Sequence, residues 1–255
     1  MKIATWNVNS LRVRLDHVLE WLELAKPDVL ALQETKLKDE DFPAEAFTAL
    51  GYQAAFSGQP TYNGVALITR EAAADPVTDI EGLSDPQRRV LGATIGDTRI
   101  FNLYVPNGQS VDSDKYRYKL EWLEALRVQL SRELERHARC ILLGDFNIAP
   151  EDRDVHDPDA WRGKVLCSDA ERAALGSLLE LGFADVFRRF EQPEKSYSWW
   201  DYRAAAFRRN MGLRIDLILA SEPLTALCTS CAIDVEPRRL ERPSDHTPVV
   251  AEFAT

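Results

Sequence analysis

Short apolar runs recur along the chain and predict β-strands. They cover Lys2–Asn7, Asp28–Gln33, Tyr52–Ser57, Val65–Thr69, Val90–Ile95, Arg99–Tyr104, Ile141–Leu143, Tyr197–Trp200, Leu213–Ala220 and Val249–Phe253. Runs of this length bounded by turn residues are typical of strands. Asn63-Gly64 and Gly96-Asp97 stand between consecutive runs and are hairpin signals. Because hairpins pair strands antiparallel, the sheets are not all parallel.

Apolar residues at helical spacing predict α-helices between these strands. Leu15–Ala25 carries an apolar stripe, and the proline that follows ends it. Lys115–His137 repeats leucines along one side and predicts a long amphipathic helix. Ser168 and Glu171 form a capping box for a further helix that ends near Gly182.

Strand and helix signals alternate over the whole chain, without a repeat or a flexible linker. A chain of this length buries roughly 75% of its unfolded surface in one core. We therefore expect a single α/β domain over residues 1–255, with mixed sheets packed face to face and helices outside. The polar stretch Ala149–Cys167 is long for a loop, and such loops are more often functional than not.

Composition is that of an ordinary globular protein, with 45% apolar and 28% charged residues. No signal-like segment opens the chain, and no apolar run approaches the ~20 residues of a membrane span. We expect a cytoplasmic protein without a membrane partner. Cys228 and Cys231 form a C-x-x-C pair, but no second pair or histidine follows at zinc-finger spacing, so we expect reduced thiols.

The formal net charge of −10 argues against a passive nucleic-acid-binding module, which usually carries a basic surplus. It does not argue against a nuclease, because acids are needed around a cation and phosphate contacts need only a local basic face. Candidates for such a face are Arg12, Arg14, Lys36, Lys38, Arg88, Arg89, Lys115 to Lys119, Arg162, Lys164 and Arg203 to Arg214.

Polar residues at the ends of the apolar runs carry the chemical signal. The sequence GDFN places Asp145 and Asn147 after one run, and SDH places His246 before another. Asn7 and Glu34 end two further runs, whereas Asp216 lies within a third, ahead of Leu217–Leu219. Packing explains polar groups at such positions poorly, whereas a site that binds a metal and attacks a phosphate explains them well.

Phosphodiester hydrolysis needs a cation, a base for water and donors to the phosphate oxygens. Glu34 is the first candidate ligand, and oxygen ligands favour Mg²⁺ or Mn²⁺ over zinc. Asp145 and Asn147 face the same way on extended backbone, so an acid and an amide converge on one phosphate. Asp216 is the best partner to orient His246.

Seven segments of the chain together form a wider pattern: TWNVNSLR (Thr5–Arg12), LQETK (Leu32–Lys36), YVPNG (Tyr104–Gly108), GDFN, SWWDYR (Ser198–Arg203), GLRID (Gly212–Asp216) and SDH. In these segments the chain resembles the exonuclease III branch of the endonuclease/exonuclease/phosphatase superfamily. This resemblance implies a four-layer α/β sandwich with two mixed, mainly antiparallel sheets. It also implies a Mg²⁺-dependent DNA repair nuclease, with Mn²⁺ as a substitute, that cuts 5′ to abasic sites and acts on 3′ ends as exonuclease and phosphatase.

The resemblance also implies roles for matched positions. Those that match the metal site are Asn7, Glu34, Asp145, Asn147, Asp245 and His246. Those that match the catalytic group are Tyr104, Asp145, Asn147, Asp216 and His246, with Asp145 either activating water or protonating the leaving group. Those that match substrate contacts are Asn107, Trp199, Leu213 and Arg214, where Trp199 and Leu213 would wall a pocket for a base-free sugar. Core packing is the alternative for Trp199 and Leu213.

Two other functions remain open. GDxN and SDH also occur in phosphoinositide phosphatases and sphingomyelinases of the same superfamily, although SWWDYR and GLRID favour the nuclease branch. A catalytically inactive RNA-binding regulator on this fold would lack one of the acids, Asn147 or His246, and all are present. For the nuclease we expect double-stranded DNA with abasic sites or blocked 3′ ends as partner. We also expect a monomer that in a prokaryote associates with the nucleoid.

Overall fold

The computed structural model describes residues 1–254, and its strands form two six-stranded sheets. The first sheet has the order β11-β12-β1-β2-β4-β3, and the second has the order β5-β6-β7-β8-β10-β9. The strands of the first sheet are β1 (Lys2–Asn7), β2 (Val29–Gln33), β3 (Gln53–Ser57), β4 (Val65–Thr69), β11 (Cys228–Ile233) and β12 (Val249–Phe253). Those of the second are β5 (Ala74–Val77), β6 (Val90–Ile95), β7 (Thr98–Tyr104), β8 (Cys140–Asp145), β9 (Phe183–Asp185) and β10 (Asp216–Ser221).

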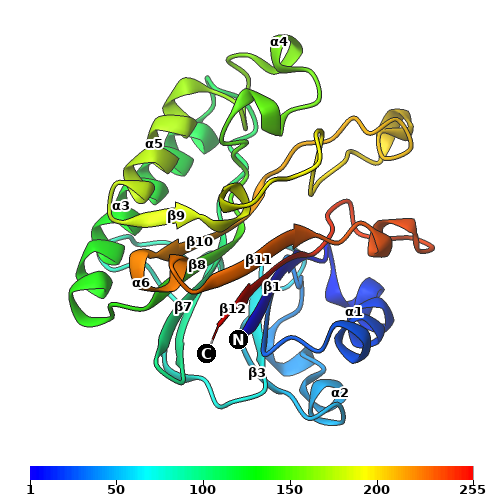
Figure 1. The fold of residues 1–255 in the computed structure, drawn as a ribbon, viewed down its shortest axis with the longest axis vertical. Coiled ribbons are helices and arrows are strands. Elements are labelled where there is room, and N and C mark those ends of the chain that lie inside the picture. The colour runs from blue at the N-terminus through cyan, green and yellow to red at the C-terminus, as the bar shows by residue number, and fades with distance from the viewer. Residues whose placement is uncertain (255) are drawn as a thin grey trace.

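Helices cover the outer faces of both sheets (Figure 1). These are α1 (Leu11–Ala25) and α2 (Ala44–Thr48) on the first sheet and α3 (Asp114–Arg136) and α5 (Asp169–Leu179) on the second, whereas α4 (Pro158–Trp161) lies in a loop beyond the sheets and α6 (Glu222–Thr225) lies in the connection between β10 and β11. Leu11, Val18 and Leu22 of α1 share a buried cluster with residues of β1, β2 and β4. Leu123 and Leu126 of α3 do the same against the second sheet, together with α5. The apolar faces of α1, α3 and α5 are therefore each buried against one sheet.

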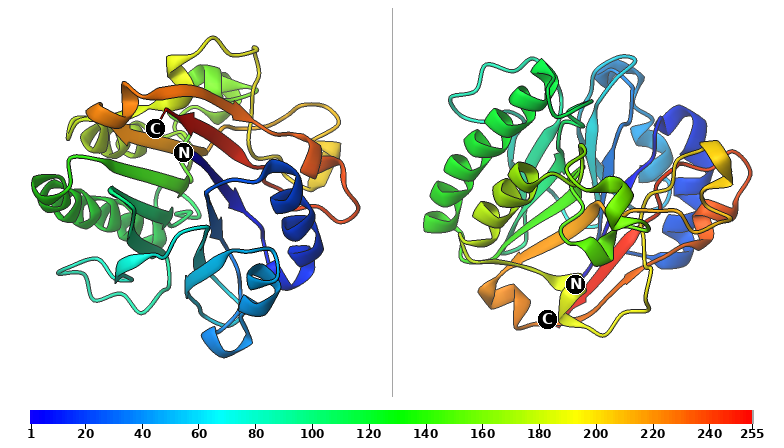
Figure 2. Two further views of the ribbon diagram at one scale, coloured as in Figure 1. Left: turned by 60° about the horizontal axis from the view of Figure 1, so that its bottom comes forward. Right: turned by 90° about the horizontal axis from the view of Figure 1, so that it is seen from above.

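The central core lies between the two sheets. Ile3 and Leu67 of the first sheet pack in one buried cluster with Ile100, Leu143 and Ile218 of the second. The two turned views show the layers edge-on, with helices on either side of the paired sheets (Figure 2). The predicted four-layer α/β sandwich is confirmed.

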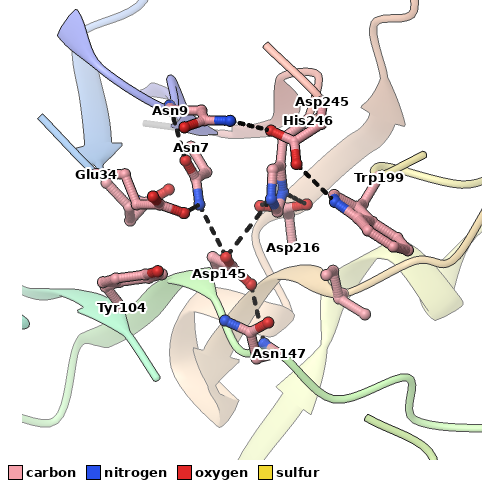
Figure 3. A network of polar contacts seen from close by, with 12 residues as sticks. Asn7, Asn9, Glu34, Tyr104, Asp145, Asn147, Trp199, Asp216, Asp245 and His246 are labelled. Carbon is pink, nitrogen blue, oxygen red and sulfur yellow. Dashed lines mark hydrogen bonds and ion pairs between the residues drawn. The ribbon is translucent and has the colours of Figure 1, made fainter. Parts of the chain in front are cut away.

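Each sheet contains one parallel strand pair at its centre. β1 pairs parallel with β2, β7 pairs parallel with β8, and every other pairing among residues 1–254 is antiparallel. Parallel strands need a crossover, which α1 and α3 supply. The carboxyl ends of both pairs open at the same end of the sandwich, and this end carries the polar strand tips (Figure 3).

The strongest local signals are confirmed. The predicted Lys115–His137 helix appears as α3, and the capping box of α5 forms with Ser168 Oγ accepting from Glu171 N. The α1 helix is longer than the stripe predicts and begins at Leu11. The stretch Ala149–Cys167 is not a bare loop, because it contains a 3₁₀ turn at Asp152–Asp154 and α4.

Other strand predictions were wrong in part. Tyr197–Trp200 is not a strand, since Trp199 makes only isolated bridges to Leu213 and His246. The strand predicted from Leu213 begins at Asp216, because Arg214 N donates to Asp154 O outside the sheet. The edge strands β5, β9 and β11 were not predicted, because they are short or partly exposed and lack a continuous apolar run.

All four cysteines are free, as predicted, with Cys228 and Cys231 on β11. Within residues 1–254, none of the helices has both the length and the apolar character that crossing a bilayer requires.

Candidate active site

Polar side chains from both sheets meet where the parallel pairs end (Figure 3). Asn7 is the last residue of β1 and Glu34 follows β2, while Tyr104 and Asp145 end β7 and β8. Asp216 opens β10 and pairs in register with Asp145. The antiparallel partners of the central strands thus complete a ring of side chains at one end of the sandwich.

Asn7 joins the two sheets at this ring. Its Nδ2 donates to Glu34 Oε1 at 2.9 Å and to Asp145 Oδ2 at 2.9 Å. Its own oxygen accepts from Asn9 N at 2.9 Å. In this arrangement the Asn7 amide links the two carboxylates, and a role of Asn7 as a metal ligand stays a prediction.

Glu34, Asp145 and His246 form the one cluster of potential metal ligands found in residues 1–254. Each offers an atom that lies within 4.8 Å of the atoms of the other two. Together with Asp216, they place three carboxylates around one histidine, so negative charge exceeds positive charge in a mostly buried space. A hard divalent cation fits such a donor set, because it neutralises carboxylates and prefers oxygen ligands.

The side chains of Asn147 and Asp245 make other contacts next to this cluster. Asn147 Nδ2 donates to Val105 O at 3.0 Å, and its Oδ1 accepts from Asn107 Nδ2 at 3.1 Å. Asp245 instead accepts from Asn9 Nδ2 at 2.9 Å and from Trp199 Nε1 at 3.0 Å. Both residues therefore lie beside the cluster of potential ligands, with their side chains engaged by other groups.

His246 is buried and held by Asp216. The distances from His246 Nδ1 to the Asp216 carboxylate oxygens are 2.9 and 3.1 Å, and His246 Nε2 lies 3.7 Å from Asp145 Oδ2. Burial by itself would lower the pKa of His246, but the carboxylates of Asp216 and Asp145 outweigh it and raise that pKa to about 10. The two carboxylates thus favour a protonated imidazole whose Nε2 faces Asp145. In that state Nε2 can donate a hydrogen bond but cannot bind a metal, which leaves Glu34 and Asp145 as the ligands that the cluster offers.

Asp145 is the most heavily constrained acid of the site. Its Oδ1 accepts from Asn147 N at 2.9 Å while its Oδ2 accepts from Asn7. Burial raises the pKa of Asp145, and the negative charge of Asp216 adds to this effect, whereas the His246 cation opposes it. A carboxylate with a raised pKa exchanges a proton more readily near neutral pH than an ordinary aspartate does.

Tyr104 supplies a hydroxyl near the carboxylates of Glu34 and Asp145. Burial, followed by the charges of Glu34 and Asp145, raises the pKa of its phenol well above the usual value. The phenol therefore stays protonated and can donate a hydrogen bond. The guanidinium of Arg89 stacks over the Tyr104 ring, 4.6 Å from its centre, and holds the ring in place by a cation–π contact.

Two site residues adopt left-handed backbone conformations. Glu34 has φ 53° and Asn147 has φ 50°. This conformation costs energy in residues other than glycine. It persists where surrounding contacts hold it in place, as happens at functional sites. Around Glu34 these contacts include Ser10 N, which donates to Glu34 O at 2.8 Å.

The substrate contacts predicted beyond this ring need correction. Arg214 is 1% exposed, and its guanidinium donates to Asp154 and Asp185, each at 2.7 Å, so it does not face a substrate. Leu213 is completely buried and has no surface to offer a sugar. Trp199 is partly exposed above Leu213 and remains available as a pocket wall.

Asn9 was missed by sequence reasoning. Its side chain contacts Asp245 through Nδ2 and Lys36 Nζ through Oδ1. Lys36 Nζ also lies 2.9 Å from Glu34 Oε2. Both residues fall within TWNVNSLR and LQETK, so their position in these segments was the available signal.

Comparisons with known proteins agree with this geometry. The Endonuclease/Exonuclease/phosphatase family matches residues 4–246. Exodeoxyribonuclease III of Haemophilus influenzae is 35% identical over 99% of this chain and 100% of its own length. A 3′ phosphatase, NExo, from Neisseria, solved with a product DNA hairpin, is 47% identical with a TM-score of 0.98, and 100% of each chain is covered. An AP endonuclease from Archaeoglobus fulgidus is 41% identical with a TM-score of 0.96, again over 100% of both chains.

The family match covers almost the entire chain, and the curated relative is similar over its full length. The fold and the arrangement of acids at the strand ends agree with that match. The chain therefore belongs to the endonuclease/exonuclease/phosphatase family, as a hydrolase of ester bonds of the exonuclease III type.

Proposed function

We propose that this protein is a Mg²⁺-dependent DNA repair nuclease made of a single domain over residues 1–255. It hydrolyses the phosphodiester bond 5′ to an abasic site and removes nucleotides and phosphates from 3′ ends. The observation that carries the proposal is the meeting of Glu34, Asp145 and the Asp216–His246 pair in one mostly buried cluster. The printed names of its relatives, an exodeoxyribonuclease, a 3′ phosphatase and an AP endonuclease, support the same three activities.

The proposed reaction uses each group in a defined way. A divalent cation held by Glu34 and Asp145 would neutralise charge on the phosphate. His246, kept as a cation by Asp216, directs Nε2 at the phosphate oxygens. Asp145 exchanges a proton, either as base for the attacking water or as acid for the leaving oxygen.

Two amides and a phenol complete the phosphate site. Tyr104 presents its protonated hydroxyl beside Glu34. Asn107 and Asn147 are joined by a hydrogen bond and sit on neighbouring loops after β7 and β8. Donors placed in advance around a phosphate stabilise the charge that develops in the transition state without reorganising.

Damage recognition is assigned to the partly exposed face of Trp199. An abasic nucleotide costs less to swing out of the helix than a stacked one, and an apolar wall that fits a bare sugar turns this difference into selectivity. Trp199 is fixed for this task, since its Nε1 donates to Asp245. Leu213 supports Trp199 from below rather than touching the sugar.

The test is a parallel assay of three duplexes, which carry an abasic analogue, a 3′-phosphate or a plain recessed 3′ end. We expect cleavage of all three with Mg²⁺, loss of cleavage in EDTA, and recovery when Mg²⁺ or Mn²⁺ is added back. Trp199→Ala should lower abasic cleavage more than 3′-phosphate removal. Turnover that survives EDTA would refute the metal requirement, and RNA binding without cleavage of any duplex would favour the regulator.

We also propose that the protein acts as a monomer in the cytoplasm, at the nucleoid of a prokaryotic cell. The ring of site residues is completed within one chain, so a second copy is not needed to build it. Light scattering of the purified protein alone and with a short duplex measures its mass, and a dimer in both samples would contradict the proposal.

A further inference from the structure

Helix α3 carries a lysine whose side chain is completely buried. Lys119 is 0% exposed, and its ammonium forms an ion pair with Glu171 of α5, which is also 0% exposed. Burying two charges is expensive, and replacing such a pair by neutral residues is often harmless or stabilising. The pair therefore calls for an explanation other than stability.

The remaining contacts of this ammonium lead into the phosphate site. Lys119 Nζ donates to Asn147 O at 2.6 Å and to Asn107 O at 3.2 Å. These are the two residues whose side chains are hydrogen-bonded to each other. They lie on separate loops, one after β7 and the other after β8. A single buried charge thus ties together the backbones of both amide donors.

The two loops are shaped around Lys119. Asn147 adopts φ 50°, a conformation that needs support from its surroundings, and Lys119 holds the carbonyl of this residue. Gly108 adopts φ 95°, and a Cβ added there would lie 3.2 Å from Lys119 Cδ. The glycine of the YVPNG segment therefore leaves room for the lysine stem beneath the loop.

Glu171 completes the pair through the capping box of α5. Its Oε2 accepts from Ser168 N at 3.1 Å and from Ser168 Oγ at 2.6 Å, and its Oε1 accepts from Leu166 N at 3.0 Å. Glu171 Oε1 thus accepts from both the backbone amide of Leu166 and the ammonium of Lys119. The same sequence signal that starts α5 also fixes the counterion of Lys119.

We propose that Lys119 and Glu171 form a buried positioning pair that sets Asn107 and Asn147 for contact with the scissile phosphate. Neither residue touches the substrate, and both act through the two asparagines. The inference rests on the proposed function, because it takes the phosphodiester as the group that these amides face.

The decisive variant is Lys119→Met combined with Glu171→Gln, which removes both charges and so leaves no uncompensated charge in the interior. We expect it to fold, with kcat on the preferred duplex reduced about 10- to 100-fold and a smaller change in KM, as is typical when groups shift slightly from a reactive position. The matched control is Arg127→Met with Glu124→Gln, an exposed pair on the same helix, which should keep wild-type kcat.

A second readout separates positioning from a general structural role. If the pair acts through the two asparagines, then adding Lys119→Met and Glu171→Gln to a variant with Asn107→Ala and Asn147→Ala should cost little further kcat, because coupled residues are non-additive. Losses that multiply, or wild-type kcat in the folded charge-free variant, would overturn the inference. Should that variant not fold, Lys119→Gln with Glu171→Gln keeps two hydrogen-bonding groups in place and is judged by the same comparison. A wild-type protein that cleaves none of the three duplexes would instead refute the proposed function.

Discussion

At the scale of single residues, the site consists of polar groups that hold one another. Asn7 fixes Glu34 and Asp145, and Asp216 fixes His246. Buried polar groups need such partners, because an unpaired one costs about 1–3 kcal/mol. Orientation at this site is therefore a product of mutual hydrogen bonding, and removing one group affects its neighbours.

Glu34→Gln tests the metal site. The amide keeps the shape of the side chain but loses the charge that binds a hard cation, so turnover at ordinary Mg²⁺ concentrations should be abolished while the melting temperature changes little. Activity is measured over a Mg²⁺ titration. Glu40→Gln, at an exposed neighbouring acid, is the control and should behave as wild type. Near-normal turnover of Glu34→Gln at sub-millimolar Mg²⁺ would remove Glu34 from the ligand set.

Asp216 and His246 should behave as one unit. We expect His246→Ala to lower kcat by at least roughly 10²-fold, the lower end for a positioned acid–base group. Asp216→Asn should also lower kcat, because the imidazole loses the charge that holds it as a cation. The double variant should be little worse than His246→Ala alone. Single-turnover rates of the four proteins measure this, and fully additive losses would show that Asp216 acts elsewhere.

At the scale of elements, two parallel strand pairs bring the site together. The helices α1 and α3 return the chain so that β1 with β2 and β7 with β8 end side by side. The backbone is close-packed here, since Gly144 in β8 adopts φ 147° and a Cβ at this position would collide with the carbonyl oxygen of Leu103 in β7. The position of Asp145 therefore depends on a glycine that precedes it.

Gly144→Ala should destabilise the protein strongly. The methyl group meets backbone rather than a flexible side chain, so β7 and β8 must separate, and overpacking of this kind costs about 1–3 kcal/mol or more. Denaturant unfolding measures the loss. Gly176→Ala in α5 is the matched control, because its Cβ meets open space and alanine favours the helix by about 0.5–1 kcal/mol. Equal stability of the two variants would show that the strands yield without cost.

At the scale of the whole molecule, a buried amide pair connects the two sheets behind the site. Gln33 Nε2 of β2 donates to Asn102 Oδ1 of β7 at 2.7 Å. Asn102 Nδ2 in turn donates to Leu32 O at 2.9 Å and to Ala66 O at 2.8 Å in the first sheet. Glu34 follows Gln33 directly, so this link sets the distance of Glu34 from Tyr104 and Asp145 on the second sheet.

Asn102→Ala should therefore affect both stability and metal binding. The buried carbonyls of Leu32 and Ala66 lose the Asn102 donor, and each buried group left unpaired lowers the free energy of unfolding by about 1–3 kcal/mol. It also frees the sheets to shift, so the Mg²⁺ concentration for half-maximal activity should rise. Chemical unfolding and a Mg²⁺ titration measure the two effects, with Gln53→Ala at an exposed position of β3 as control. A stability loss with unchanged Mg²⁺ dependence would limit the amide pair to a structural role.

The sequence alone determined the elements with a strong local pattern and the residue types of the site. The apolar run of β12, the leucine stripe of α3 and the capping box of α5 all lie within the segments they form. Hydrophobic periodicity is a local property, so it predicts such elements without knowledge of the fold. Glu34 and Asp145 stood out for a related reason, because acids at the ends of apolar runs conflict with packing.

Tertiary structure decided which polar residues meet at the candidate site and which are paired inside the fold. Arg214 lies beside site residues in the sequence, yet Asp154 and Asp185, 60 and 29 positions away, bind its guanidinium in the interior. Lys119 looked like one more surface charge, and only the approach of α5 buries it against Glu171. The partner of a charge is set by packing between distant segments, because burial removes water and leaves only protein groups to satisfy it.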